Sequence, residues 1–342
     1  MEENFADWEG ERRTLMARNI SDLGLSITGT RVERMVEQLY DELGQKGLAY
    51  RPPVYLSDQW GCPDGTPLIG IPFYLADPRL ERIEDEQAEG IETDEQSMRF
   101  LRHEAGHAFN YAYRFYDRAD WRQTFGPYSR PYRDRYRADP FSHDFVRHIL
   151  GWYAQKHPDE DFAETFAVWL TPNIEWREVY ADWPALRKLE YVDRVVRDVG
   201  EDIPPVPVPE PDDLPVDAMS YPLEEHYRDA AEAIPISDPR IFDGDLRNVF
   251  ASGDESPEGQ DASAFLESHR REIVGRISYW TGESTFVVRQ FLDFIRGRSE
   301  LLRLRVRGLE ASTLIEITAF GTAVMMNYRH TNSLDSMDAD DS

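Results

Sequence analysis

Two histidines and a glutamate stand at the spacing of a metal-binding helix. The segment His103-Glu104-Ala105-Gly106-His107 has the pattern H-E-x-x-H. Residues four apart in a helix lie one turn apart on the same face, so both imidazoles could reach one metal ion. Glu104 points to the side, which suits a general base beside the ion rather than a third ligand. The motif predicts metal-assisted hydrolysis; the alternative is a buried amphipathic helix that holds two structural histidines.

A long helix must carry this motif, and the flanking residues predict one from about 94 to 117. Thr93 followed by Gln96 has the pattern of a capping box at its start. Apolar residues then recur at helical spacing. Gly106, at the centre, has no side chain, so it would let another backbone or a substrate approach the metal face.

A second helix, expected to begin at Pro158 and to stop at Pro172, is predicted to supply the third ligand. Glu164 lies in the middle of its apolar residues. Burying a carboxylate is costly unless it is paired or bound to a metal. We therefore expect Glu164 to complete a site with His103 and His107. The alternative is a glutamate that faces solvent on a half-exposed helix.

Other polar residues near Glu164 are candidates for supporting roles. Asp161 could accept a hydrogen bond from a ligand imidazole. Tyr153, His148 or His157 could stabilise an oxyanion from across a cleft. Each of these three could equally be a loop or packing residue.

The two motifs together resemble the gluzincin metallopeptidases, and in particular a bacterial group of zinc-binding metallopeptidases. Two segments carry the resemblance, which covers roughly residues 50 to 190. They are Arg-His-Glu-Ala-Gly-His-Ala-Phe-Asn-Tyr-Ala-Tyr and Asp-Glu-Asp-Phe-Ala-Glu-Thr-Phe-Ala-Val-Trp-Leu-Thr-Pro. The resemblance implies a zincin-like fold, zinc held by His103, His107 and Glu164, and Glu104 as general base. The second motif lacks the N-E-x-x-S-D sequence pattern of the thermolysin group, which leaves the substrate class open.

The composition limits the kinds of partner that the chain can bind. The 342 residues carry a net charge of −27, which argues against binding nucleic acid through its phosphates. All but three of the 38 basic residues are arginines, and the acidic balance favours neutral or basic substrates. The single cysteine, Cys62, excludes a disulfide within the chain.

Nothing in the sequence predicts a membrane partner. The N-terminal residues have neither the basic nor the apolar region of a signal peptide. The longest apolar stretch, about 314 to 326, is too short to span a bilayer. A cytoplasmic location is the default expectation.

The expected fold class is α+β and predominantly α-helical. A zincin-like domain over residues 1–202 would contain the metal-site helix and a small antiparallel sheet, formed by strands near 53–57 and 68–75. A proline-rich linker would follow at 203–215. Residues 216–334 would form a helical domain of unknown role, and 335–342 a disordered acidic tail.

These features favour a zinc-dependent hydrolase that cleaves peptide or amide bonds in a peptide or protein substrate. One alternative is a catalytically inactive, zinc-stabilised scaffold whose C-terminal helical region binds a partner or another copy. Another is an amide hydrolase that acts on a non-protein substrate. Glu104 argues against the scaffold, because a purely structural zinc site has no need of a base.

Overall fold

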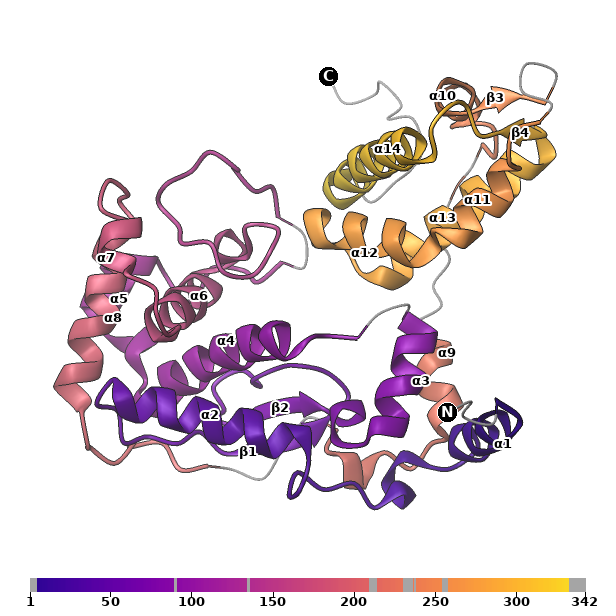
Figure 1. The fold of residues 1–342 in the computed structure, drawn as a ribbon. Coiled ribbons are helices and arrows are strands. Elements are labelled where there is room, and N and C mark those ends of the chain that lie inside the picture. The colour runs from indigo at the N-terminus through magenta and orange to yellow at the C-terminus, as the bar shows by residue number, and fades with distance from the viewer. Residues whose placement is uncertain are drawn as a thin grey trace. The chain divides into compact units, whose positions relative to one another are not determined.

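The computed structural model of the protein describes residues 5–88, 91–133, 136–208, 214–229, 236, 238–253 and 258–331 (Figure 1). The chain divides into two compact units, the first formed by Met1–Glu84 with Ile91–Tyr227 and the second by Asp85–Gly90 with Arg228–Ser342. Helices dominate both units and the sheets are small, so the predicted α+β, mainly helical class is confirmed.

The elements up to residue 229 are, in chain order, α1 (Phe5–Met16), η1 (Ile20–Leu23), α2 (Arg31–Gln45), β1 (Val54–Ser57), β2 (Ile69–Pro72), η2 (Phe73–Ala76), α3 (Pro78–Ala88), α4 (Asp94–Tyr113), η3 (Phe115–Asp117), α5 (Ala119–Phe125), η4 (Tyr153–Gln155), α6 (Pro158–Leu170), α7 (Trp176–Val179), α8 (Leu186–Val199), η5 (Val216–Ala218) and α9 (Leu223–Asp229). The remaining elements are α10 (Asp243–Val249), β3 (Ala251–Ser252), α11 (Ala262–Ser268), α12 (Arg270–Thr281), α13 (Thr285–Leu301), β4 (Leu304–Arg305) and α14 (Glu310–Thr331).

The core of the first unit surrounds α4 and α6, which lie side by side (Figure 1) and pack against each other. Most residues of both helices are buried. Amphipathic helices cover this pair. Helix α2 packs against α4, and α8 packs against α6. Each of the two covering helices buries a stripe of apolar residues spaced three and four apart, as expected for a surface helix. The two covering helices thus shield α4 and α6 from solvent.

The prediction that the two strands near 53–57 and 68–75 pair antiparallel is wrong, because β1 and β2 pair in parallel, with Val54 opposite Ile69. The connection between the strands reverses direction before β2 begins. Gly61 lies in this connection and forms an antiparallel bridge with Gly70, in which each N–H donates to the other carbonyl. The backbone contact that runs antiparallel to β2 is therefore made by the connecting segment and not by β1. The antiparallel pair that the structure does contain, β3 with β4, lies in the second unit.

The first unit extends beyond the predicted boundary. Val206, in the proline-rich segment, donates its N–H to the carbonyl of Ala112 in α4. Val216, Met219 and Leu223 are buried in the core of the first unit. Residues 209–213 of the expected linker and the expected tail at 335–342 lie outside the described residues. In the part of the chain described, no helix has the length and apolarity that crossing a membrane requires.

Candidate metal centre

Helix α4 begins and ends at clear local signals. The capping box is present, since Gln96 N–H donates to the Thr93 hydroxyl and Thr93 N–H donates to the Gln96 side chain. The helix stops at Arg114, which adopts a left-handed conformation with φ of 53°. The helix is shorter than the expected 94 to 117, and the motif lies near its middle.

His157 is the N-cap residue of helix α6, and its ring Nδ1 accepts a hydrogen bond from the N–H of Asp159 at 3.2 Å. Pro158 occupies the first turn, where its missing N–H costs nothing. Three acidic residues follow in the same turn, where the helix dipole favours them. These local features position the acidic side chains of α6 opposite α4.

The two helices run antiparallel, and the contacts between their side chains follow from this direction. His103 contacts Glu164, His107 contacts Glu160, and Asn110 contacts Asp159. Residues further along α4 thus meet residues earlier in α6.

Gly106 makes the close approach of the two helices possible. A Cβ atom at this position would lie 2.8 Å from Cα of Ala163 and 2.9 Å from its carbonyl oxygen. The expectation that Gly106 admits another backbone is therefore confirmed.

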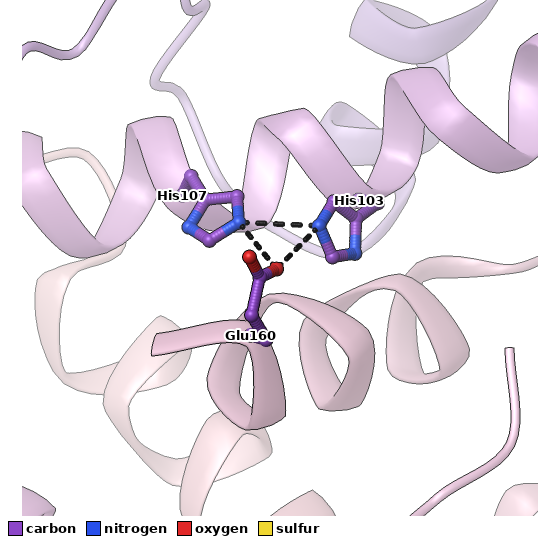
Figure 2. A group of neighbouring side chains, drawn as sticks. All are labelled: His103, His107 and Glu160. Atoms are coloured by element: carbon purple, nitrogen blue, oxygen red, sulfur yellow. Dashed lines mark hydrogen bonds and ion pairs between the residues drawn. The ribbon is translucent and has the colours of Figure 1, made fainter. Parts of the chain in front are cut away.

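Three potential ligand atoms face one another between the helices (Figure 2). Nε2 of His103 and Nε2 of His107 are 3.1 Å apart, and each lies 3.1 Å from Oε2 of Glu160. Ligand atoms bound to one tetrahedral zinc ion at ~2.0–2.2 Å lie about 3.3–3.6 Å from one another. Two imidazoles and one carboxylate are also a donor set that zinc prefers in catalytic sites. The side chains present therefore fit a zinc ion.

The outer nitrogen of each imidazole faces another carboxylate. Nδ1 of His103 lies 2.8 Å from Oε1 of Glu164, and Nδ1 of His107 lies 3.0 Å from Oδ2 of Asp159. An ionised carboxylate can only accept, so Nδ1 of His103 carries the proton and leaves the Nε2 lone pair of that ring for a metal. Nδ1 of His107 lies close to Asp159 but makes no hydrogen bond of good geometry. Oε2 of Glu164 accepts a second hydrogen bond, from the N–H of Ile149 at 2.8 Å.

The electrostatics of the cluster favour a cation. Burial alone would lower the pKa of His103, but hydrogen bonds to Glu160 and Glu164 outweigh burial and raise this pKa to about 9. Burial would likewise lower the pKa of His107, whereas the charges of Asp159 and Glu160 raise it strongly. The carboxylates of Asp159, Glu160 and Glu164 thus stabilise positive charge beside the two rings. A bound divalent ion would provide such a charge.

The cluster opens into a cavity of about 490 Å³. Glu104 lines the cavity, and burial raises the pKa of its carboxyl group. Tyr153 lines it too, with its ring centre 5.5 Å from that of His103. Tyr132 reaches in from the segment before α6 and donates its hydroxyl hydrogen bond to Oε1 of Glu160. Tyr132 falls in a segment that shows no periodicity, so sequence analysis did not single it out.

Other residues singled out from the sequence lie in different places. Asp161 points away from the histidines and accepts a hydrogen bond from Nζ of Lys188 at 2.7 Å. Nε2 of His148 lies 2.9 Å from the carbonyl oxygen of Arg99, outside the cavity lining, and burial lowers the pKa of this ring to about 4. His157 lines the cavity, but both of its ring nitrogens already have hydrogen-bond partners.

The structure therefore brings Glu164 to the site, but to the outer nitrogen of His103 rather than to the group of ligand atoms. Glu160 takes the place expected of Glu164. The sequence contained a signal for this arrangement. Glu160 and Glu164 are four residues apart on one helix face, so two glutamates one turn apart can meet two histidines one turn apart on an antiparallel helix.

Comparison with known proteins agrees with the geometry. No curated protein and no solved structure matches the chain. Residues 76–175 match the model of a family described as "Putative zinc-binding metallo-peptidase". The matched residues include all of α4 and α6, and with them both histidines, Glu160 and Glu164. Over the segment that forms the metal centre, the chain is similar to this family of zinc-binding metallopeptidases.

Proposed function

We propose that the protein is a zinc-dependent peptidase in which His103, His107 and Glu160 hold the metal. The observation that carries the proposal is the set of three ligand atoms spaced 3.1 Å apart, with a carboxylate at the outer nitrogen of each ring. Glu160 replaces Glu164 as the third ligand in this proposal. Glu164 and Asp159 become positioning residues that hold the ring orientation and the tautomer of the two histidines.

When bound, zinc supplies the Lewis acidity that activates water and polarises a carbonyl group. Glu104 is the general base of the proposal. Its carboxylate takes a proton from the attacking water and passes it to the nitrogen of the leaving amine. Burial raises the pKa of Glu104, which brings the carboxyl group closer to the pH at which it must both accept and release a proton.

Tyr153 is the best supported of the three candidates for stabilising the oxyanion. Its ring lies beside His103 in the cavity, and burial raises the pKa of its hydroxyl, so the group stays protonated and can donate. His148 lies outside the cavity lining, and His157 has both nitrogens engaged.

An inactive zinc scaffold is the competing proposal, and the cavity argues against it. A structural zinc site is closed by four protein ligands, whereas a catalytic site keeps a position open. The described residues offer three ligands, and the group borders a cavity that also contains Glu104.

Metal analysis of the purified protein combined with hydrolysis of a peptide library tests the proposal. The wild-type protein should contain stoichiometric zinc and cleave peptides. Glu104→Gln should keep the zinc and lose roughly 10²- to 10⁴-fold in turnover, the usual contribution of a general base. Absence of stoichiometric zinc in the wild type would overturn the proposal, and full activity of Glu104→Gln would remove this residue from the mechanism.

A further inference from the structure

The cavity beside the metal centre contains one strongly basic side chain. Among the described residues that line it, Arg130 is the sole arginine or lysine. The guanidinium group makes no ion pair with any carboxylate of the described ranges. Arg130 is exposed, so its charge is available to a ligand that enters from solvent. An unpaired guanidinium in a substrate cavity selects for a carboxylate, which it can bind through two parallel hydrogen bonds.

The position of Arg130 is tied to the metal centre through His157. Nδ1 of His157 accepts a hydrogen bond from the N–H of Asp159, so the proton of the neutral ring lies on Nε2. That Nε2 lies 2.7 Å from the carbonyl oxygen of Arg130 and donates to it. The N–H of Arg130 in turn donates to the carbonyl of Pro127. The same histidine therefore caps the helix that carries Glu160 and hydrogen-bonds the backbone of Arg130.

The acidic side chains of the cavity already have partners or roles. Asp64 accepts a hydrogen bond from the hydroxyl of Tyr128. Glu160 faces both imidazoles and Tyr132. Glu104 is the proposed base. The net charge of −27 favours basic or neutral substrates for the chain as a whole. Within the cavity, however, Arg130 is the one strongly basic side chain among the described lining residues, and it has no ion-pair partner there.

We propose that Arg130 is a specificity-determining residue that binds a carboxylate of the substrate, so that the protein prefers peptides with an acidic group next to the bond that is cleaved. This inference rests on the proposed peptidase function. The carboxylate could belong to an aspartate or glutamate side chain or to the C-terminus of a short peptide. Both sources present the same planar anion to the guanidinium.

The test uses the full-length, zinc-loaded protein and N-acetylated alanine hexapeptides that carry one glutamate at each position in turn. Each peptide has a glutamine counterpart, and each is made with a free and with an amidated C-terminus. Cleavage is measured as kcat/KM for the wild type, Arg130→Gln, Arg130→Lys and Arg130→Glu. Arg133→Gln is the matched control, because Arg133 is exposed in the same segment but does not line the cavity. Binding of the same peptides to Glu104→Gln and to Glu104→Gln/Arg130→Gln is measured in parallel.

The wild type should prefer glutamate over glutamine at one position, or a free over an amidated C-terminus, by about 10- to 100-fold, the usual effect of a charge-assisted hydrogen bond. Arg130→Gln should remove the preference, Arg130→Lys should keep part of it, and Arg130→Glu should reverse it, so that the glutamine or amidated peptide is cleaved faster than its charged counterpart. The control should behave as the wild type.

The same preference in Arg130→Gln as in the wild type, or none in either protein while both cleave peptides, would overturn the inference and leave the peptidase proposal intact. Binding that depends on Arg130 and on the carboxylate, without cleavage by the wild type, would overturn the peptidase proposal and support the role of Arg130.

Discussion

Glu164 accepts a hydrogen bond from Nδ1 of His103 at 2.8 Å, on the side of the ring away from the nitrogen that faces Glu160 and His107. This contact determines which nitrogen of His103 can bind a metal. It also explains why a carboxylate is tolerated at a fully buried position, because both of its oxygens accept hydrogen bonds. These hydrogen bonds, and not a contact with an ion, offset the cost of burying Glu164.

The two glutamates of α6 should therefore differ in their effect on the metal. Glu160→Gln removes a proposed ligand, and we expect it to abolish stoichiometric zinc. Glu164→Gln removes an outer partner, and we expect it to weaken zinc binding by about 10- to 100-fold while leaving the ligands in place. Zinc content after purification and competition with a chelator measure both effects.

Glu178→Gln, at an exposed position of the same unit, is the control and should bind zinc as the wild type does. Complete loss of zinc from Glu164→Gln together with full retention in Glu160→Gln would restore the ligand set expected from the sequence.

The sequence was sufficient to predict the helices of the site but not the pairing of their side chains. The capping box at Thr93 and the proline at 158 are local signals, and the structure contains both helices. The choice between Glu160 and Glu164 depends on the direction and rotation of α6 relative to α4, which periodicity along one helix does not determine. Glu164 stands out in sequence because its neighbours are apolar. Apolar neighbours indicate that Glu164 is buried, and a buried glutamate can be either a metal ligand or the hydrogen-bond partner of a ligand.

The predicted direction of the strand pairing was wrong for a similar reason. The residue pattern predicts both β1 and β2 as strands, but their relative direction depends on how the connection between them folds. The bridge between Gly61 and Gly70 is a contact between backbones, and no side-chain pattern predicts it. Helices α3 and α5 were not expected, because they are short or lie in segments without clear apolar periodicity.

Gly106→Ala should destabilise the first unit although alanine is the better helix former. The change favours the helix by about 1 kcal/mol. The new methyl group would, however, meet backbone atoms of Ala163 at 2.8 and 2.9 Å, and forcing extra atoms into a packed core costs about 1–3 kcal/mol or more. We therefore expect a lower Tm and weaker zinc binding.

Gly10→Ala is the matched control for this change. Gly10 lies in α1 and has open space where the methyl group would go, so the substitution should leave Tm unchanged or raise it. A Tm for Gly106→Ala at or above that of the wild type would contradict the close packing of α4 against α6.

The stability of the first unit should depend on pH through Asp120. Partial burial would raise its pKa, but hydrogen bonds from Arg118 and Arg194 outweigh burial and lower the pKa to about 2. Because the folded pKa is below the ordinary value of 3.8, the contribution to stability is complete above that value and is lost as the pH falls through about 2. The contribution should be less than about 1 kcal/mol, since solvent screens these exposed pairs.

Asp120→Asn should therefore lower the free energy of unfolding slightly at neutral pH and reduce its decline on acidification. Denaturant unfolding at a series of pH values measures both effects. Asp182→Asn, at an exposed position of the same unit, is the control. An unchanged acid dependence in Asp120→Asn would show that the two arginines do not stabilise the folded state through this carboxylate.

Lys188 should stabilise the first unit because it neutralises Asp161 where α8 packs against α6. Its Nζ donates to Oδ2 of Asp161 at 2.7 Å and to the carbonyl oxygen of Asp144 at 2.5 Å, and both charged side chains are buried. Lys188→Met would leave a buried carboxyl group without its partner. Removing one partner of a buried ion pair typically costs about 3–5 kcal/mol, and we expect a smaller loss here because burial raises the pKa of Asp161 to about 7, so the group can take up a proton. Adding Asp161→Asn should recover part of this loss, because a neutral amide tolerates burial better than a charge. Chemical denaturation of the single and double variants measures the difference, and a double variant less stable than Lys188→Met would contradict a role for Lys188 in neutralising Asp161.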